Sequence, residues 1–127
     1  MKTAADILFR TVSPQLLVSN IDTSLDFYRT ILGFRIDFRY ENFYVGIIKD
    51  ACSIHLKLAD SPTDEREFRR ANAHLDLTII VDELDEMYRL ISKNEVEVTQ
   101  ALREMEYGRE FYIADPDGYI LAFMEDA

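Results

Sequence analysis

Cysteine is nearly absent from the sequence, and so are the long apolar runs of membrane proteins. Cys52 is the only cysteine among 127 residues, so it cannot form an internal disulfide, and its apolar surroundings predict a buried thiol. No apolar run approaches the roughly 20 residues that a membrane-spanning helix needs. Residues 1–12 lack the apolar stretch and the cleavage site of a secretory signal. We therefore expect a cytoplasmic protein that makes no contact with a membrane.

Positive charge is also scarce. There are 14 lysines and arginines against 24 aspartates and glutamates, which gives a formal net charge of −10. This excess of acid argues against nucleic acid as a partner, because the chain would repel the phosphate backbone. It is compatible with a cationic ligand, or with acidic side chains that only keep the surface soluble.

Motifs of several well-known enzyme classes are missing as well. The sequence contains no Gly-x-Ser-x-Gly, no phosphate-binding loop, no Cys-x-x-Cys and no glycine-rich dinucleotide motif. The chemistries that depend on these motifs therefore lack support.

The sequence does contain an internal repeat. Residues 25–31 and 84–91 both begin with Leu-Asp and contain a Tyr-Arg pair, and each follows a strand-like run that ends in valine. Both segments have apolar residues at helical spacing, which predicts two helices. A repeat at roughly 60 residues indicates two copies of one supersecondary module rather than a solenoid, which needs at least about three units.

Strand-like runs follow each predicted helix, so each half is expected to form a β-α-β-β-β module and the chain an α+β fold. We place module one at about residues 13–60 and module two at about residues 73–125. The charged connector between them, about residues 61–72, is either a solvated linker or a short helix. Residues 1–12 lie outside the pattern and are expected to cover a sheet edge.

Three of the predicted strands alternate between apolar and polar residues, so each has one apolar and one polar face. The apolar faces carry leucine, isoleucine and valine, and we expect the helices to cover them. Each polar face either meets water or lines a cavity. The residues on the polar faces are Ser13, Gln15, Ser53, His55, Lys57, His74, Asp76 and Thr78.

Three motifs follow one another along residues 13–125. They are residues 18–34, with the run Ser-Leu-Asp-Phe-Tyr, residues 81–85, and Gly-Arg-Glu-Phe-Tyr at 108–112 followed by Asp-Pro-Asp-Gly at 115–118. In this order and spacing the chain resembles the vicinal oxygen chelate superfamily, which includes glyoxalase I, extradiol dioxygenases, and the bleomycin- and fosfomycin-resistance proteins. The resemblance implies two βαβββ modules that form a curved mixed sheet around a cleft. It also implies a homodimer, which usually completes the site.

Metal-using members of this superfamily place ligands at four equivalent points, which the resemblance carries over to Ser13, His55, Asp76 and Ala122. Histidine or glutamate is typical there. Here His55 is a typical ligand and Asp76 can coordinate, but Ser13 coordinates poorly. Ala122 has no donor atom. A catalytic metal generally has three protein ligands, so we expect no metal and no other cofactor; a set of His55, His74 and Asp76 is the alternative.

Aromatic residues on the predicted strands and turns would rim the cleft. We expect Tyr112 inside it and Phe111 under a helix. Tyrosines beside acids suit a planar or cationic guest, through stacking and cation–π contact. The predicted ligand-binding residues are Ser13, Gln15, His55, Lys57, His74, Asp76, Tyr112 and Ala122.

The favoured hypothesis is a homodimeric binding protein of the bleomycin-resistance type, which sequesters a small organic molecule in its clefts without catalysis. One alternative is an enzyme: a lyase or dioxygenase with an unusual metal set, or a metal-independent isomerase that uses His55 as a base, with Asp76 as its orienting carboxylate. Another alternative is a regulatory or structural partner that uses the domain only to dimerise.

Overall fold

The structure, a computed structural model, describes residues 1–61 and 64–127. The strands of the first half are β1 (Gln15–Val18), β2 (Arg35–Tyr40), β3 (Tyr44–Lys49) and β4 (Cys52–Leu58). Those of the second half are β5 (Leu77–Ile80), β6 (Glu97–Met105), β7 (Gly108–Ala114) and β8 (Ile120–Asp126). The helical segments are η1 (Ala4–Asp6), α1 (Ile21–Asp26), η2 (Phe27–Ile31), α2 (Arg66–Asn72) and α3 (Leu84–Ser92). The connector between the halves therefore contains a short helix, α2.

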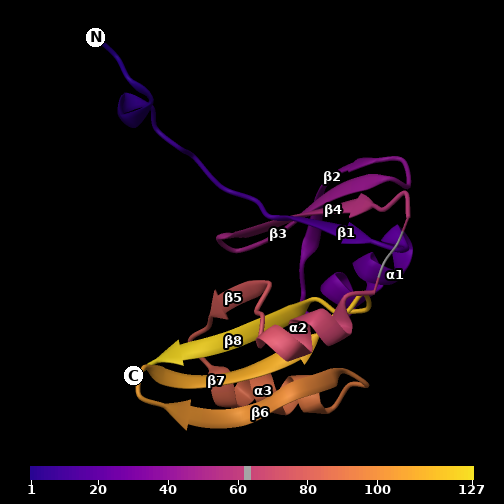
Figure 1. Ribbon diagram of the computed structural model, residues 1–127, viewed down its shortest axis with the longest axis vertical. Helices are drawn as coiled ribbons and strands as arrows, with labels where there is room; N and C mark the ends of the chain where they lie inside the picture. Colours follow the sequence, from indigo (N-terminus) through magenta and orange to yellow (C-terminus); the bar gives the residue numbers. More distant parts are fainter. Residues whose placement is uncertain (62–63) are drawn as a thin grey trace.

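The strands form two four-stranded sheets with the same internal order (Figure 1). The order is β1-β4-β3-β2 in the first sheet and β5-β8-β7-β6 in the second. In each sheet the first strand pairs in parallel with the last, and the other neighbours are antiparallel. This repetition confirms the predicted α+β fold class, with two copies of one unit.

The first repeated segment forms α1 and η2, a single helix whose winding changes part-way. Asn20 caps its start, because its side-chain oxygen accepts a hydrogen bond from the backbone N–H of Thr23 at 2.9 Å. The winding is π-helical over Phe27–Ile31, and Gly33 follows the helix with a φ of +81°. The second repeated segment forms α3. Both predicted helices are therefore present, and the first is less regular than its sequence spacing indicates.

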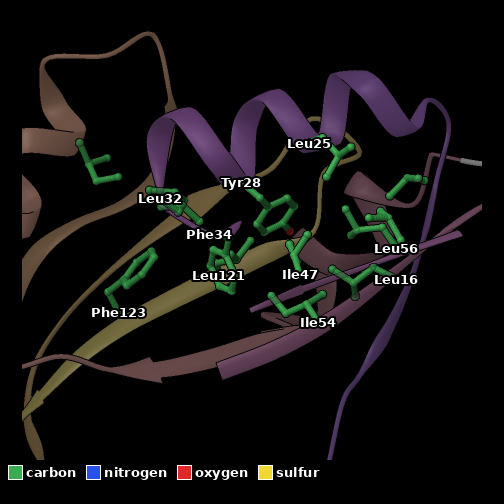
Figure 2. Packing of buried hydrophobic residues seen from close by; sticks show 14 of the residues in the cluster. Leu16, Leu25, Tyr28, Leu32, Phe34, Ile47, Ile54, Leu56, Leu121 and Phe123 are labelled. Carbon is green, nitrogen blue, oxygen red and sulfur yellow. The ribbon is translucent and has the colours of Figure 1, made fainter. Parts of the chain in front are cut away.

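One apolar core joins the two sheets through α1. Figure 2 shows Leu25, Tyr28 and Leu32 pointing from this helix toward the strands. The strand residues in the same cluster include Ile47, Ile54, Leu56, Leu121 and Phe123. The last two belong to β8, so the core crosses from one module to the other. Because full burial of such a side chain contributes roughly 1.5–3 kcal/mol, this shared core holds the modules together.

The Asp-Pro-Asp-Gly turn before β8 attaches the second module to the first, at η2 and at the residue that follows β1. The hydroxyl of Tyr28 donates to Asp115 Oδ2 at 2.7 Å, and Asp117 Oδ1 accepts a hydrogen bond from the backbone N–H of Ser19 at 3.0 Å. Gly118 has a φ of +85°, and a Cβ atom there would lie 2.6 Å from Cγ of Arg66. Backbone angle and contact both require glycine. The turn is therefore a contact between modules as well as the start of a strand.

Residues 1–12 do not cover a sheet edge. In Figure 1 this N-terminal arm runs from β1 away from both sheets. The side chains of Leu8, Phe9 and Val12 are each at least 82% exposed, and that of Ile7 is 53% exposed. The prediction that residues 1–12 cover a sheet edge is therefore wrong for the single chain.

Cys52 lies at the start of β4 and is only partly buried against the core, so the predicted burial of its thiol is incomplete. None of the helices in the described part of the chain has the length and apolar character that crossing a bilayer requires.

Asp115 gives the fold a specific pH dependence. Burial raises the pKa of its carboxyl group to about 6, although hydrogen bonds from the Tyr28 hydroxyl and from the backbone N–H groups of Tyr119 and Asp117 act in the opposite direction. A carboxyl group whose pKa is higher in the folded state than in the unfolded state favours folding while it is protonated. Its contribution is therefore complete below about pH 4 and is lost as the pH rises through about 6.

We expect the Asp115→Asn variant to lack this pH dependence. Between about pH 4 and pH 7, the free energy of unfolding of the wild type should fall relative to that of the variant by about 2–3 kcal/mol. Urea denaturation at each pH measures the difference. Asp126→Asn, at an exposed residue, is the control and should follow the wild type. Parallel curves for the wild type and Asp115→Asn would contradict a raised pKa.

Candidate functional site

The eight predicted site residues divide between the two sheets. Those on or beside the first sheet are Ser13, Gln15, His55 and Lys57. Those on or beside the second are His74, Asp76, Tyr112 and Ala122. Among the described residues, no hydrogen bond joins one group to the other. Each module therefore carries its own half of the predicted site.

The tyrosine–histidine cluster of the first sheet comprises Gln15, Phe38, Tyr44 and His55. Tyr44 Oη lies 2.9 Å from Nδ1 of His55, and Nε2 of Gln15 donates to the same hydroxyl oxygen at 3.1 Å. The Tyr44 hydroxyl therefore connects Gln15 and His55, and the tautomer of His55 decides whether it donates to Nδ1 or accepts from it. Phe38 packs edge-on against the imidazole, with the ring centroids 5.1 Å apart.

Gly46 makes room for this cluster. It lies opposite His55 in the β3–β4 pair, and a Cβ atom on it would be 2.1 Å from Cε2 of Phe38. Any larger residue at this position would push the phenylalanine ring from its place against the imidazole. The two remaining predicted residues of this sheet lie outside the cluster: Ser13 hydrogen bonds with Ser53 at 2.6 Å, and Lys57 is exposed.

Asp76 is held by groups of its own module. Its Oδ2 accepts hydrogen bonds from Nε of Arg69 at 2.9 Å and from the backbone N–H of Ile120 at 2.8 Å. Its Oδ1 lies 3.2 Å from Nε2 of His74. The side chain is only 11% exposed, so the carboxylate fastens α2 to the start of β8. A pair of His55 with Asp76, considered from the sequence, is therefore not formed.

A buried carboxylate network lies in the second sheet. Glu110 is fully buried; its Oε1 accepts a hydrogen bond from the Tyr107 hydroxyl at 2.7 Å, and its Oε2 accepts from the Tyr112 hydroxyl and from Nε of Arg103, both at 2.8 Å. Burial raises the pKa of Glu110, but the three donors outweigh it and the pKa is lower than usual. The hydrogen bond to Glu110 also raises the pKa of Tyr107 to about 12. At neutral pH the network is therefore a charged carboxylate with protonated phenols.

A cavity of about 620 Å³ opens between α2 and strands β6 and β7. Two of the predicted site residues, His74 and Tyr112, line it. Its other charged lining residues are Arg66, Arg69, Arg70, Glu97 and Arg103. The sequence analysis missed these arginines, because three of them lie in the charged connector and the fourth on a strand of mixed composition.

The residues at the four superfamily ligand points do not fit a metal ion. Ala122 is fully buried and offers only a methyl group, Ser13 pairs with Ser53, and Asp76 is engaged by Arg69 and the backbone. Among residues 1–61 and 64–127, no three histidine, cysteine, aspartate or glutamate side chains are placed to hold a metal ion. The set of His55, His74 and Asp76 is not assembled, so no step through a metal follows from this site.

Comparison with known proteins identifies the family. The family model of the Glyoxalase/Bleomycin resistance protein/Dioxygenase superfamily matches residues 9–123. The chain belongs to this superfamily. The resemblance found in the sequence motifs is therefore confirmed at the level of the superfamily.

Individual members differ in how closely they resemble the chain. A lactoylglutathione lyase from Neisseria meningitidis is 26% identical over 125 residues, which cover 91% of this chain and 90% of that protein. A solved glyoxalase/bleomycin resistance protein/dioxygenase from Alicyclobacillus acidocaldarius superimposes with a TM-score of 0.75 at 18% identity, covering 92% of this chain and 91% of that one. TioX from Micromonospora sp. ML1 gives a TM-score of 0.77 at 13% identity, covering 94% and 100%. The structural likenesses show a common fold.

The Glu110 network predicts a loss of stability when its charge is removed. Glu110→Gln keeps the shape of the side chain but weakens the charge-assisted hydrogen bonds that hold Arg103 and two phenols. We expect the free energy of unfolding to fall by about 1.5–3 kcal/mol, measured by urea denaturation. Glu106→Gln, at the exposed β6–β7 turn, should change it by less than about 0.5 kcal/mol. Equal effects of the two substitutions would show that Glu110 does not anchor the network.

Proposed function

We propose that this protein binds a small organic molecule and needs no metal ion to do so. The observation that carries the proposal is Ala122, which replaces a ligand with a methyl group. Ala122 pairs across the sheet with Tyr112, and Tyr112 lines the 620 Å³ cavity. Sites for drug-sized molecules are typically about 300–1,000 Å³. The chain thus combines a cavity of suitable size with a ligand point that cannot coordinate.

We further propose that the functional unit is a cytoplasmic homodimer. Each sheet has its first strand, β1 or β5, at an edge, and the edges expose Leu17 and Ile80 at 50% and 57%. Unpaired edges with exposed apolar residues favour pairing with another chain. A second copy that covers these edges would bury their exposed apolar side chains. The exposed apolar residues of the N-terminal arm favour the same arrangement.

A lyase is the second candidate function. The 26% identity to a lactoylglutathione lyase over 90% of that protein favours it, and His55 is a residue that can bind a metal or act as a base. A lyase that used a metal would have to assemble its ligand set from residues other than Ala122. The two candidates therefore differ in whether a stoichiometric metal accompanies the purified protein.

Elemental analysis of protein purified without a histidine tag separates these candidates. We expect well under one transition metal ion per chain, and we expect neither a chelator nor added Zn²⁺ or Ni²⁺ to shift the melting temperature, because a site that binds only the folded form would raise it. His74→Ala is the matched control for His55→Ala. A stoichiometric metal that His55→Ala alone removes would support the lyase and contradict a metal-free binder.

The homodimer can be tested through the N-terminal arm. Replacing Leu8 and Phe9 together by serine removes two exposed apolar side chains whose burial against a partner would each contribute roughly 1.5–3 kcal/mol. We expect the dissociation constant of the dimer to rise by at least about tenfold, measured by light scattering over a dilution series. Thr11→Ser, in the same arm, should leave it unchanged. A monomeric wild type, or a dimer indifferent to the double substitution, would refute the role of the arm.

A further inference from the structure

The charge of the cavity is opposite to that of the chain. The protein carries a net charge of −10 and has ten arginines. Four of those arginines, with His74, line one cavity whose only acidic lining residue among those described is Glu97. The acidic surface made a cationic guest plausible from composition alone. The side chains that line the cavity instead favour an anionic ligand.

Two of these arginines are held in place by ion pairs with buried carboxylates. Asp76 holds Nε of Arg69 at 2.9 Å, and Glu110 holds Nε of Arg103 at 2.8 Å. The acid side chains are 11% and 0% exposed. An arginine has five N–H donors in a planar fork, and Nη1 of each has no hydrogen-bond partner among the described residues. The acids therefore set the orientation of the guanidinium groups and leave donors for a guest.

Of the other two arginines, Arg70 can change partner at little cost. Arg70 is 70% exposed, and its one ion-pair partner among the described residues is Glu67, itself 87% exposed, at 3.3 Å. Exposed pairs of this kind are stabilised by at most about 1 kcal/mol. An anion in the cavity can therefore draw the guanidinium group of Arg70 from Glu67. Arg66 pairs with Asp64 at 3.0 Å and lies 3.7 Å from Glu97, and its Nη2 donates to the backbone carbonyl of Pro116 at 2.9 Å.

The wall of the cavity also has an aromatic and apolar part. The guanidinium carbon of Arg103 lies 5.6 Å from the centroid of the Tyr112 ring, and Leu75, Val98 and Ile120 line the same space. A tyrosine ring and aliphatic side chains favour a planar or apolar body, while the arginines favour a carboxylate, sulfonate or phosphate group.

We propose that the guest of this cavity is a small organic anion with an aromatic or otherwise apolar body. Arg66, Arg70 and the free donors of Arg103 would bind its acidic group, and Tyr112 would contact its body. This inference rests on the proposed function, because it names the class of molecule bound in the same cavity.

A matched pair of fluorescent probes tests the sign of the guest. The first is 1-anilinonaphthalene-8-sulfonate; the second is N-phenyl-1-naphthylamine, which has the same ring system without the sulfonate. We expect the full-length protein to bind the sulfonate at least about tenfold more tightly, because its charge-assisted hydrogen bonds have no counterpart in the neutral probe. Benzoate should displace the sulfonate probe, and benzamidine at the same concentration should not.

Substitutions place the binding in the cavity. Arg70→Gln, at an exposed residue, should weaken binding of the sulfonate about threefold or more and leave the neutral probe unchanged. Arg103→Gln should have a larger effect of the same kind. Arg89→Gln is the control, because Arg89 pairs with Glu86 on α3 outside the cavity lining. Gln100→Trp should abolish binding of both probes, since Gln100 lines the cavity and its side chain bonds only to the neighbouring Ala101 carbonyl among the described residues.

The possible failures are distinguishable. Equal affinity for the two probes, or equal loss of both in Arg70→Gln and Arg103→Gln, would overturn the anionic class while a binding cavity remains. Binding that survives Gln100→Trp lies elsewhere and would overturn both the class and the proposed cavity. Absence of binding by either probe to the wild type would do the same.

Discussion

The shared apolar core holds the two modules together, and the hydrogen bond from the Tyr28 hydroxyl to the buried Asp115 carboxyl helps to fix their relative position. This hydrogen bond joins residues 87 positions apart along the chain, one in the helix of the first module and the other in the turn before β8. The hydroxyl of Tyr119 donates to the backbone carbonyl of Leu17 at 2.7 Å and strengthens the same junction. Because β8 is the central partner of both β5 and β7, this junction also determines where the second sheet and its cavity lie.

Buried acids organise the second module in the same way at three places. Asp76, Glu110 and Asp115 are each almost fully removed from water, and each is satisfied by arginine, tyrosine or backbone donors. An unpaired buried carboxylate would cost several kcal/mol, so these donors are held in fixed positions around it. The acidity of the chain is thus partly internal. Net charge describes the surface and says little about the cavity.

Much of the fold could be predicted from the sequence, because its signals are local. Period-two alternation placed Tyr112 on the face that lines the cavity, and the repeated helical spacing indicated two modules. The pairing of Arg103 with Glu110 could also have been predicted from the sequence. The two residues face each other across the β6–β7 hairpin, and the short turn before Gly108 sets that register.

Other features could not be predicted, because they depend on long-range contacts that the spacing of apolar residues along the sequence does not reveal. In the sequence, Arg69 is one of several charges in a run that resembles a solvated linker. Its hydrogen bond to Asp76 becomes apparent only when α2 is placed beside the second sheet. The N-terminal arm lies outside the repeat, which suggested that it covers an edge, but it runs away from both sheets of its own chain. In both cases the missing information was where the segment lies relative to the two sheets.

At Asp76 the guanidinium group of Arg69 balances the charge of a nearly buried carboxylate. The carboxylate remains at a superfamily ligand position, but the positive charge beside it is the guanidinium of Arg69, which the covalent chain supplies. Arg103, which also lines the cavity, is paired with the buried Glu110 in the same way. A buried acid behind an arginine needs no ion from solution, and it directs the remaining guanidinium donors away from the acid. The arginines therefore place positive charge along this wall of the cavity, in positions that the buried acids fix.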